Sequence, residues 1–480
     1  MLTITRCQAR RLAAVFRRHA LGIAHKGPIP PLTLHADPGG GLRVRFHHPP
    51  LAVELALPGE IQEGEPVALP LEAPADVQGR DEGVVTLEAD GPGRTLVRWS
   101  DRGIPRSRAY AAMPVADLAV FPDLPERFEP NPPGLLDALV EASGTTDAGS
   151  TRYALGCLAL RGDSADLAAT DGRQVLVQGG FRWPWAGTVL VRRPPPLMGK
   201  ELPRSRPVEV GKTDTHVILR AGPWTAWLAI QDGRFPHVDH VIPAAEAAAT
   251  RLRLDPADAA FLADAIGRLP GGEVTNAPVT VDLNGVVAVR ARDGDQGPPT
   301  ELVLARSGYS GTPARFCCNR AFLARAAGLG LGELELGGPE DPVAGRGGGR
   351  VYAFQPLSRE GAIGPAEDAI RIESGPVEPP IPARQSVESP KARNPVSERS
   401  PRPRTTPSAD EGAEPSNHPG GGAGLAPLIQ EAVALHDALG DSRARAARLI
   451  GSLRRERKRS RLLTSTLAQL RALRLQEVAE

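Results

Sequence analysis

Hydrophobic and polar residues alternate with a period of two along several short segments in the first three quarters of the chain. This period is typical of β-strands that bury one face, and it predicts strands over residues 42–46, 51–57, 84–89, 95–99, 215–221, 279–283 and 286–291. Asn284-Gly285 lies between the last two segments, and this dipeptide between alternating runs is a strong hairpin signal. We therefore expect mostly antiparallel sheet.

Helical periodicity interrupts the predicted strands at three places. Residues 9–20 place Leu12, Val15 and Phe16 on one face and arginines on the other. Residues 132–144 begin with prolines and end in glycine, and residues 255–269 begin with Asp and Pro, as helices often do. Each predicted helix precedes a group of strands, at a spacing of roughly 120 residues. This order indicates three copies of one helix-plus-strands unit.

The composition changes near residue 359. Residues 359–424 are rich in Pro, Ser, Gly, Glu and Arg, and such a segment buries too little apolar surface to offset chain entropy. We predict a disordered linker there. Residues 425–480 return to helical spacing and carry the basic run 454–461. Two interpretations stay open: a small helical hairpin with a solvated basic face, or a coiled-coil or partner-binding module whose arginines contact nucleic acid or an acidic protein.

Charge and cysteine content narrow the classes of protein. The chain has 57 basic and 56 acidic residues, so any DNA contact must come from the distribution of charge. Cys7, Cys157, Cys317 and Cys318 lack the paired spacing of a zinc site and fit a reducing compartment. The N-terminal residues lack the continuous apolar core of a signal peptide, and no apolar run approaches the length of a membrane span. We expect a cytoplasmic protein without a membrane segment.

Four sequence motifs, taken together, point to a family. TRYALGCLALRGDSADLAATDGRQVLV (151–177), QDGRFPHVDHVIP (231–243), RVYAFQPLS (350–358) and VADLAVFPDLP (115–125) occur in order. In this arrangement the chain resembles the bacterial sliding clamp, the β subunit of the replicative DNA polymerase. The resemblance covers residues 1–358. It implies an α+β DNA-clamp fold with domains at 1–126, 127–247 and 248–358, followed by the linker and the C-terminal helices.

The resemblance implies a hydrophobic pocket between the second and third domains, into which short peptides of polymerase and clamp-loader subunits insert. A concave apolar site with a few polar groups suits such peptides. By position, the pocket residues are Leu155, Thr170, Gly172, Arg173, Val175, Pro236, Val241, Gln355, Pro356 and Leu357.

The resemblance also implies that two subunits join head to tail into a ring around double-stranded DNA. Basic side chains on the helices that line such a ring contact phosphates without reading sequence. The candidates are Arg10, Arg11, Arg17 and Arg18 on the first helix, and Lys26, Arg152, Tyr153, Arg192, Arg193, Lys200, Arg320 and Arg325 elsewhere.

Some segments depart from the family pattern. The second helices of the first two domains are expected near residues 70–83 and 191–203, where the first lacks apolar periodicity and the second has three prolines at its start. The chain also continues past Pro356-Leu357, where clamps usually end. We hypothesise that the C-terminal helices either compete for the peptide pocket or recruit a partner.

No enzymatic motif is evident, and we expect neither a catalytic residue nor a cofactor or metal. His237 and His240 are spaced like metal ligands, but the sequence suggests no third ligand. Three functions compete: a DNA-encircling clamp subunit that forms a homodimer, a clamp-fold scaffold or regulator that forms no ring, and a protein that binds DNA through its basic C-terminal helices.

Overall fold

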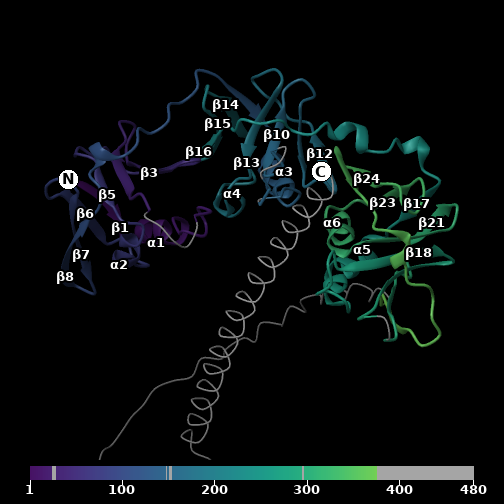
Figure 1. Ribbon diagram of the computed structural model, residues 1–480. Helices are drawn as coiled ribbons and strands as arrows, with labels where there is room; N and C mark the ends of the chain where they lie inside the picture. The colour runs from purple at the N-terminus through teal and green to yellow at the C-terminus, as the bar shows by residue number, and fades with distance from the viewer. Residues whose placement is uncertain (24–28, 148, 151–153, 295–296, 376–480) are drawn as a thin grey trace, which may run out of the picture. The chain divides into compact units, whose positions relative to one another are not determined.

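One order of elements occurs three times along the chain. The computed structural model describes residues 1–23, 29–147, 149–150, 154–294 and 297–375. Within these residues each repeat runs strand, helix, three strands, strand, helix, three strands (Figure 1). The two helices of each repeat pack against each other, as α1 does with α2, α3 with α4 and α5 with α6. The predicted antiparallel, helix-interrupted architecture is confirmed.

The first repeat extends from the N-terminus to β8. Its elements are β1 (Leu2–Thr5), α1 (Arg6–Val15), β2 (Leu32–Ala36), β3 (Leu42–His48), β4 (Leu51–Leu57), β5 (Val67–Leu69), α2 (Ala73–Val77), β6 (Val84–Ala89), β7 (Arg94–Asp101) and β8 (Ile104–Ala111). The short 3-10 helix η1 (Val115–Asp117) follows β8 and leads to the second repeat.

The second repeat has the same order of elements. They are β9 (Phe128–Asn131), α3 (Gly134–Ser143), β10 (Cys157–Arg161), β11 (Asp166–Thr170), β12 (Gln174–Gly179), β13 (Thr188–Arg192), α4 (Pro196–Lys200), β14 (Val208–Lys212), β15 (His216–Ala221) and β16 (Trp224–Ala229). Two 3-10 helices, η2 (Val238–Val241) and η3 (Ala245–Ala247), lie between β16 and the third repeat.

The third repeat adds one strand, β21, to this order. Its elements are β17 (Thr250–Arg253), α5 (Pro256–Ala265), the 3-10 helix η4 (Ile266–Arg268), β18 (Pro278–Asn284), β19 (Val286–Ala291), β20 (Thr300–Val303), β21 (Gly308–Gly311), β22 (Ala314–Asn319), α6 (Arg320–Gly328), β23 (Glu333–Leu336), β24 (Val343–Gly347) and β25 (Arg350–Phe354). After it come the 3-10 helix η5 (Arg359–Gly361) and β26 (Ile370–Glu373).

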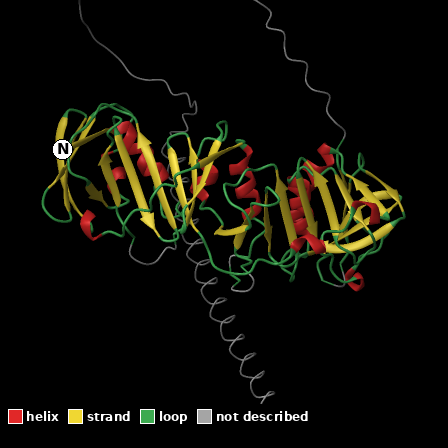
Figure 2. Cartoon of the chain, turned by 90° about the horizontal axis from the view of Figure 1, so that it is seen from above, coloured by secondary structure: helices red, strands yellow, loops and turns green. Residues whose placement is uncertain are grey.

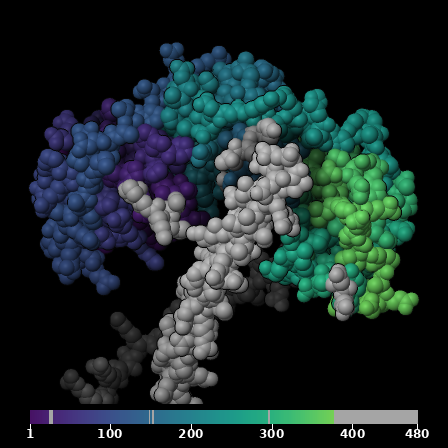
Figure 3. Space-filling view, in the orientation of Figure 1, coloured from purple at the N-terminus to yellow at the C-terminus, as the bar shows by residue number. Residues whose placement is uncertain are grey.

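The repeats are joined through shared sheets. The eight-stranded sheet, in the order β5-β2-β3-β4-β16-β15-β14-β9, joins the first repeat to the second. The nine-stranded sheet, in the order β13-β10-β11-β12-β25-β24-β23-β17-β21, joins the second to the third. Figure 2 shows these strands and the helices beside them, and Figure 3 shows the surfaces of successive repeats in contact. The sheet β1-β6-β7-β8 belongs to the first repeat, and the sheet β22-β18-β19-β20-β26 consists of four strands of the third repeat and β26.

Local sequence signals explain several element boundaries. Thr5 caps α1 in a capping box with Gln8, and the Asp255 side chain caps α5 by accepting from the Ala257 backbone N–H at 2.9 Å. The predicted hairpin between β18 and β19 is confirmed, with Gly285 at the turn in a positive-φ conformation. The second helices α2 and α4 are only five residues long, as the prolines and the weak apolar periodicity suggested.

Two expectations from the sequence are wrong. The first helix ends at Val15, because Phe16 leaves the helical conformation, so Arg17 and Arg18 follow α1 and do not lie on it. The predicted disordered linker is wrong for residues 359–375, since η5 and β26 form there and Ser374 is buried. The rest of that linker and the C-terminal helices lie outside the described residues.

Candidate partner-binding and nucleic-acid interfaces

The Thr-Asp-Gly motif forms the tight turn between β11 and β12. The Asp171 carboxylate accepts hydrogen bonds from the backbone N–H groups of Arg173 and Gln174 at 2.8 and 3.0 Å. The Thr170 hydroxyl donates to the Gln174 carbonyl at 2.6 Å and accepts from the Gly172 N–H at 3.0 Å. Gly172 has a φ of 88°, a conformation that favours glycine. Thr170, Asp171 and Gly172 therefore shape the turn.

This turn lies at the junction of the second and third repeats. The ladder between β12 and β25 pairs Val175 with Ala353, and the Gln355 N–H donates to the Arg173 carbonyl at 2.9 Å. Pro356 is buried directly after Gln355. Leu357 is half-buried, and its N–H donates to the Cys317 carbonyl at 2.7 Å. Predicted pocket residues from two repeats thus meet through one ladder.

Leu155 approaches the turn from the segment before β10. A Cβ atom placed on Gly172 would lie 3.8 Å from the Leu155 Cδ1 atom, so glycine brings the backbone within reach of this half-buried leucine. The Arg173 guanidinium is exposed and donates to the Asn276 side chain at 2.6 Å. An apolar side chain and a polar group therefore flank the same turn.

A second apolar cluster lies beneath this region, separate from the main core. Val175 belongs to it, with seven other buried side chains: Cys157, Ala159, Ala168, Leu190, Val238, Ala344 and Ala353. Alternate residues of the same strands, among them Leu158, Leu167 and Leu176, belong to the main core. Because side chains alternate across a strand, the cluster occupies the opposite face of the nine-stranded sheet.

The segment after β16 covers this second cluster. Val238 is 4% exposed within it, and Phe235 and Ile242 pack against it. Pro236 is half-buried, whereas Val241 is 57% exposed and does not contribute to the cluster. The residues of this segment that cover the cluster are therefore Phe235, Val238 and Ile242, which were not predicted, and not Val241. The spacing of these three residues, three and four apart, was the available signal.

The predicted DNA-contacting residues divide into exposed and buried groups. Arg10 and Arg11 are exposed on α1, and Arg17 and Arg18 are exposed just after it. The exposed Arg192, Arg193 and Lys200 line a cleft of about 1490 Å³ between the first and second repeats, together with His19 and Arg234. Lys26, Arg152 and Tyr153 lie outside the described residues.

Arg320 and Arg325 do not fit the predicted role. Arg320 is 6% exposed, and its guanidinium donates to the carbonyls of Leu269 and Pro270 at 2.6 Å each. Arg325 is half-buried, donates to the Glu141 carbonyl and lies over the Tyr352 ring. Burial lowers the pKa of both side chains, which still remain charged at neutral pH. Both arginines hold backbone carbonyls, and the buried Arg320 side chain is not available to phosphates.

The described residues give no sign of a metal site or a membrane span. Among residues 1–375 as described, no group of three or more His, Cys, Asp and Glu side chains is arranged to hold an ion. None of the helices described is long and apolar enough to cross a bilayer.

Comparison with known proteins identifies the fold. No protein-family model matches the sequence, and no curated protein matches it. Solved structures do match. A DNA polymerase sliding clamp from Pseudomonas aeruginosa, solved with a ligand, aligns with a TM-score of 0.62 at 16% identity, over 74% of this chain and 99% of that one. The DNA polymerase III beta chain from Streptococcus pneumoniae TIGR4 aligns with a TM-score of 0.62 at 11% identity, and a putative beta subunit from Eubacterium rectale with 0.61 at 13%, over the same shares.

The three repeats and the two shared sheets therefore define a DNA-clamp fold. The chain is a divergent member of the clamp fold found in bacterial DNA polymerase III β subunits.

Proposed function

We propose that this chain is the subunit of a sliding clamp. Two copies join head to tail into a ring that encloses double-stranded DNA, with clamp domains at 1–126, 127–247 and 248–358. A closed ring retains DNA by topology, so it needs only weak contacts that are independent of sequence. The observation that carries this proposal is the threefold fold, which matches almost the whole length of solved sliding clamps.

The surface residues support the two binding activities of such a subunit. Arg10, Arg11 and the basic cleft around Arg192 supply positive charge for phosphates. The turn at Thr170–Gln174, with Leu155 and the start of the segment after β25, supplies a site for short apolar peptides of polymerase and clamp-loader subunits. We assign the protein a non-catalytic role that requires no cofactor.

Solution mass tests this proposal. Sedimentation over a concentration series is expected to show a species with twice the mass of one chain. A peptide carrying a clamp-binding motif should bind with one site per chain, and Leu155→Asp should weaken that binding without changing the mass. A chain that stays monomeric at every concentration, even when the edge of β20 is open, would contradict the ring.

One observation favours the second candidate, a clamp-fold scaffold that forms no ring. In the third repeat's own sheet, β20 would form an open edge, but β26 pairs with it. β26 comes from the segment that follows the clamp fold. A monomer that still binds the peptide would support this scaffold function.

A further inference from the structure

The internal repeat pairs equivalent edge strands twice. β4 pairs with β16, and β12 pairs with β25, both in antiparallel register. In each case the third strand of a repeat's first three-strand group meets the last strand of the following repeat. The same rule leaves two strands without such a partner, β20 in the third repeat and β8 in the first. If a second copy follows the same rule, its β8 pairs with the edge of β20.

β8 has the character of an open edge. It is an edge strand of its sheet, and all of its residues except Tyr110 are exposed. Its equivalents at the internal junctions, β16 and β25, are mostly buried. An unpaired edge presents backbone N–H and C=O groups that readily pair with another strand.

The edge of β20 is already occupied by the chain's own β26. The two strands pair in parallel, from Thr300 opposite Ile370 to Val303 opposite Glu373. The Ile370 N–H donates to the Pro299 carbonyl at 2.9 Å, and the Ser374 N–H donates to the Val303 carbonyl at 3.0 Å. With β19 on its other side, β20 has no free edge for a third strand.

We propose that β26 is a displaceable strand that competes with β8 of a second copy for the edge of β20. This inference rests on the ring proposed above and adds that the ring closes only after β26 leaves. The apparent dimer affinity is then the intrinsic affinity multiplied by the fraction of chains whose β20 edge is open.

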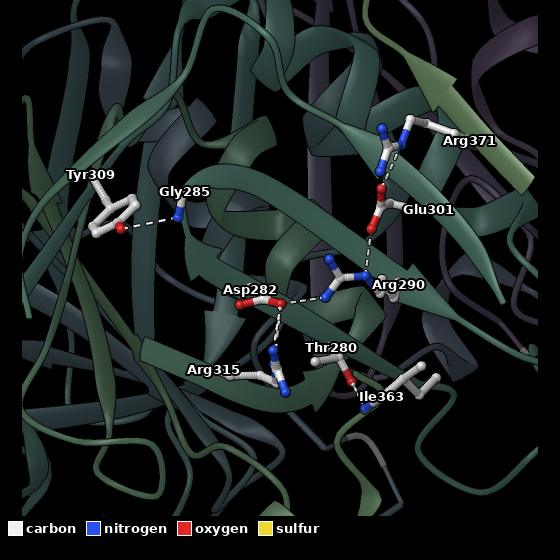
Figure 4. Close-up of polar contacts among 9 residues, drawn as sticks. All are labelled: Thr280, Asp282, Gly285, Arg290, Glu301, Tyr309, Arg315, Ile363 and Arg371. Carbon is white, nitrogen blue, oxygen red and sulfur yellow. Dashed lines mark hydrogen bonds and ion pairs between the residues drawn. The ribbon is translucent and has the colours of Figure 1, made fainter. Parts of the chain in front are cut away.

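The charge pattern around β20 permits this exchange. Figure 4 shows a row of charged side chains across five strands: Arg315, Asp282, Arg290, Glu301 and Arg371. The side chains of Asp282, Arg290 and Glu301 are at most 5% exposed. Without Arg371 the row still has two positive and two negative charges. Departure of β26 therefore leaves no buried charge without a partner, which would otherwise be costly.

The side chains of β26 itself contribute little to its attachment, which depends on its backbone hydrogen bonds and on Ser374 and Gly375 directly after it. Its four residues are all exposed, and the Arg371 side chain that contacts Glu301 is 60% exposed. An ion pair with so exposed a partner contributes little. Ser374 provides the firmest anchor, since it is 5% exposed and its hydroxyl accepts from the Ala305 N–H at 3.1 Å.

As an alternative to displacement, β8 of a second copy could pair with the outer edge of β26. That arrangement fits the pattern of the internal junctions less well. Both internal junctions join adjacent strands of the repeats directly and are antiparallel, whereas β26 runs parallel to β20. A β8 strand placed beyond β26 would lie one strand spacing, about 4.8 Å, farther out than at either internal junction. The junction of two copies would then differ from both junctions within the chain.

Two proline variants of the full chain test the competition. The N–H groups of Ile370 and Ser374 point toward β20, so by alternation that of Ile372 does too, and that of Glu373 points away. Ile372→Pro removes a bond that holds β26, whereas Glu373→Pro removes none. The dimer Kd of both variants and of the unmodified chain is measured by sedimentation. Hydrogen exchange of residues 300–303 reports whether the edge has opened.

Competition predicts that Ile372→Pro lowers the dimer Kd by about tenfold or more and that Glu373→Pro leaves it unchanged. Arg371→Ala keeps every backbone hydrogen bond and should lower the dimer Kd by a smaller factor. This variant tests the competition if Ile372→Pro folds poorly. Equal Kd values for all chains, or weaker dimers after Ile372→Pro, would overturn the inference while leaving the ring intact. If the unmodified chain and all variants are monomeric, although hydrogen exchange shows that the β20 edge is open in Ile372→Pro, both the inference and the ring would be overturned.

Discussion

The Tyr352 hydroxyl donates a hydrogen bond of 2.6 Å to the Gln174 side-chain oxygen, 178 residues earlier in the chain. Both residues are buried, and they belong to β25 and β12, the two strands that join the second and third repeats. The Gln174 side-chain amide in turn donates to the Asp171 carboxylate at 2.8 Å. The turn at the predicted peptide pocket is thereby connected to the core of the neighbouring repeat.

Replacement of Tyr352 by Phe should destabilise this junction. The change leaves the buried Gln174 oxygen without its donor, and an unsatisfied buried group costs about 1–3 kcal/mol. Tyr309→Phe is the matched control, because the Tyr309 hydroxyl accepts from an exposed turn at 3.2 Å and water can replace it. Urea unfolding should show a lower free energy of unfolding for Tyr352→Phe only. Equal losses for both variants would contradict this account of the junction.

The segment after β16 offers a comparison of two valines three residues apart. Val238 is 4% exposed in the second apolar cluster, and Val241 is 57% exposed. We expect Val238→Ala to lower the free energy of unfolding by about 2 kcal/mol, from lost burial and an unfilled cavity. Val241→Ala should change it by less than about 0.5 kcal/mol. Chemical denaturation measures both, and similar effects would show that the segment does not cover the sheet as described.

The periodicity of short segments was enough to predict the threefold repeat and seven of the 26 strands that the structure describes, since one-sided burial dictates alternation. The Thr-Asp-Gly motif likewise marked a real turn. Single residues were less predictable. Nothing local to Arg320 indicates that carbonyls of residues 269 and 270 surround it, because those contacts depend on the packing of α6 against η4. For the same reason the composition of residues 359–424 gave no indication that residues 370–373 pair with a distant strand.

The Asp258 carboxyl group predicts a pH dependence of the third repeat. It is fully buried on α5, and burial alone would raise its pKa. Hydrogen bonds from Ser374 and Ser307 and from the Arg306 backbone outweigh burial and lower that pKa. A lowered pKa in the folded state means that the stabilisation is complete above the ordinary aspartate pKa, about 4. It is lost as pH falls through the lowered value.

Thermal unfolding of the protein and of Asp258→Asn between pH 7 and pH 3 tests this dependence. The variant should melt at a lower temperature at pH 7, and the difference should shrink below about pH 4 as the carboxylate of the unmodified chain is protonated. A difference that stays constant across this pH range would show that Asp258 contributes through packing and not through its charge.

The arginines on α1 should govern the salt dependence of DNA binding. Each phosphate contact contributes about 0.9 to the slope of log K against log salt concentration. Arg10→Ala combined with Arg11→Ala should reduce that slope by about 1–2 without changing the free energy of unfolding, because both side chains are exposed. Arg320→Ala should instead destabilise the fold. An unchanged slope in the double variant would show that α1 does not contact DNA.

Retention on circular DNA tests the central claim most directly. The protein is placed on a nicked circular duplex, washed at a salt concentration that abolishes simple electrostatic binding, and measured before and after the circle is linearised. A ring that encloses DNA should remain on the circle and leave within the same wash once free ends exist. Loss from the circle under that wash, or retention on linear DNA equal to that on the circle, would contradict encirclement.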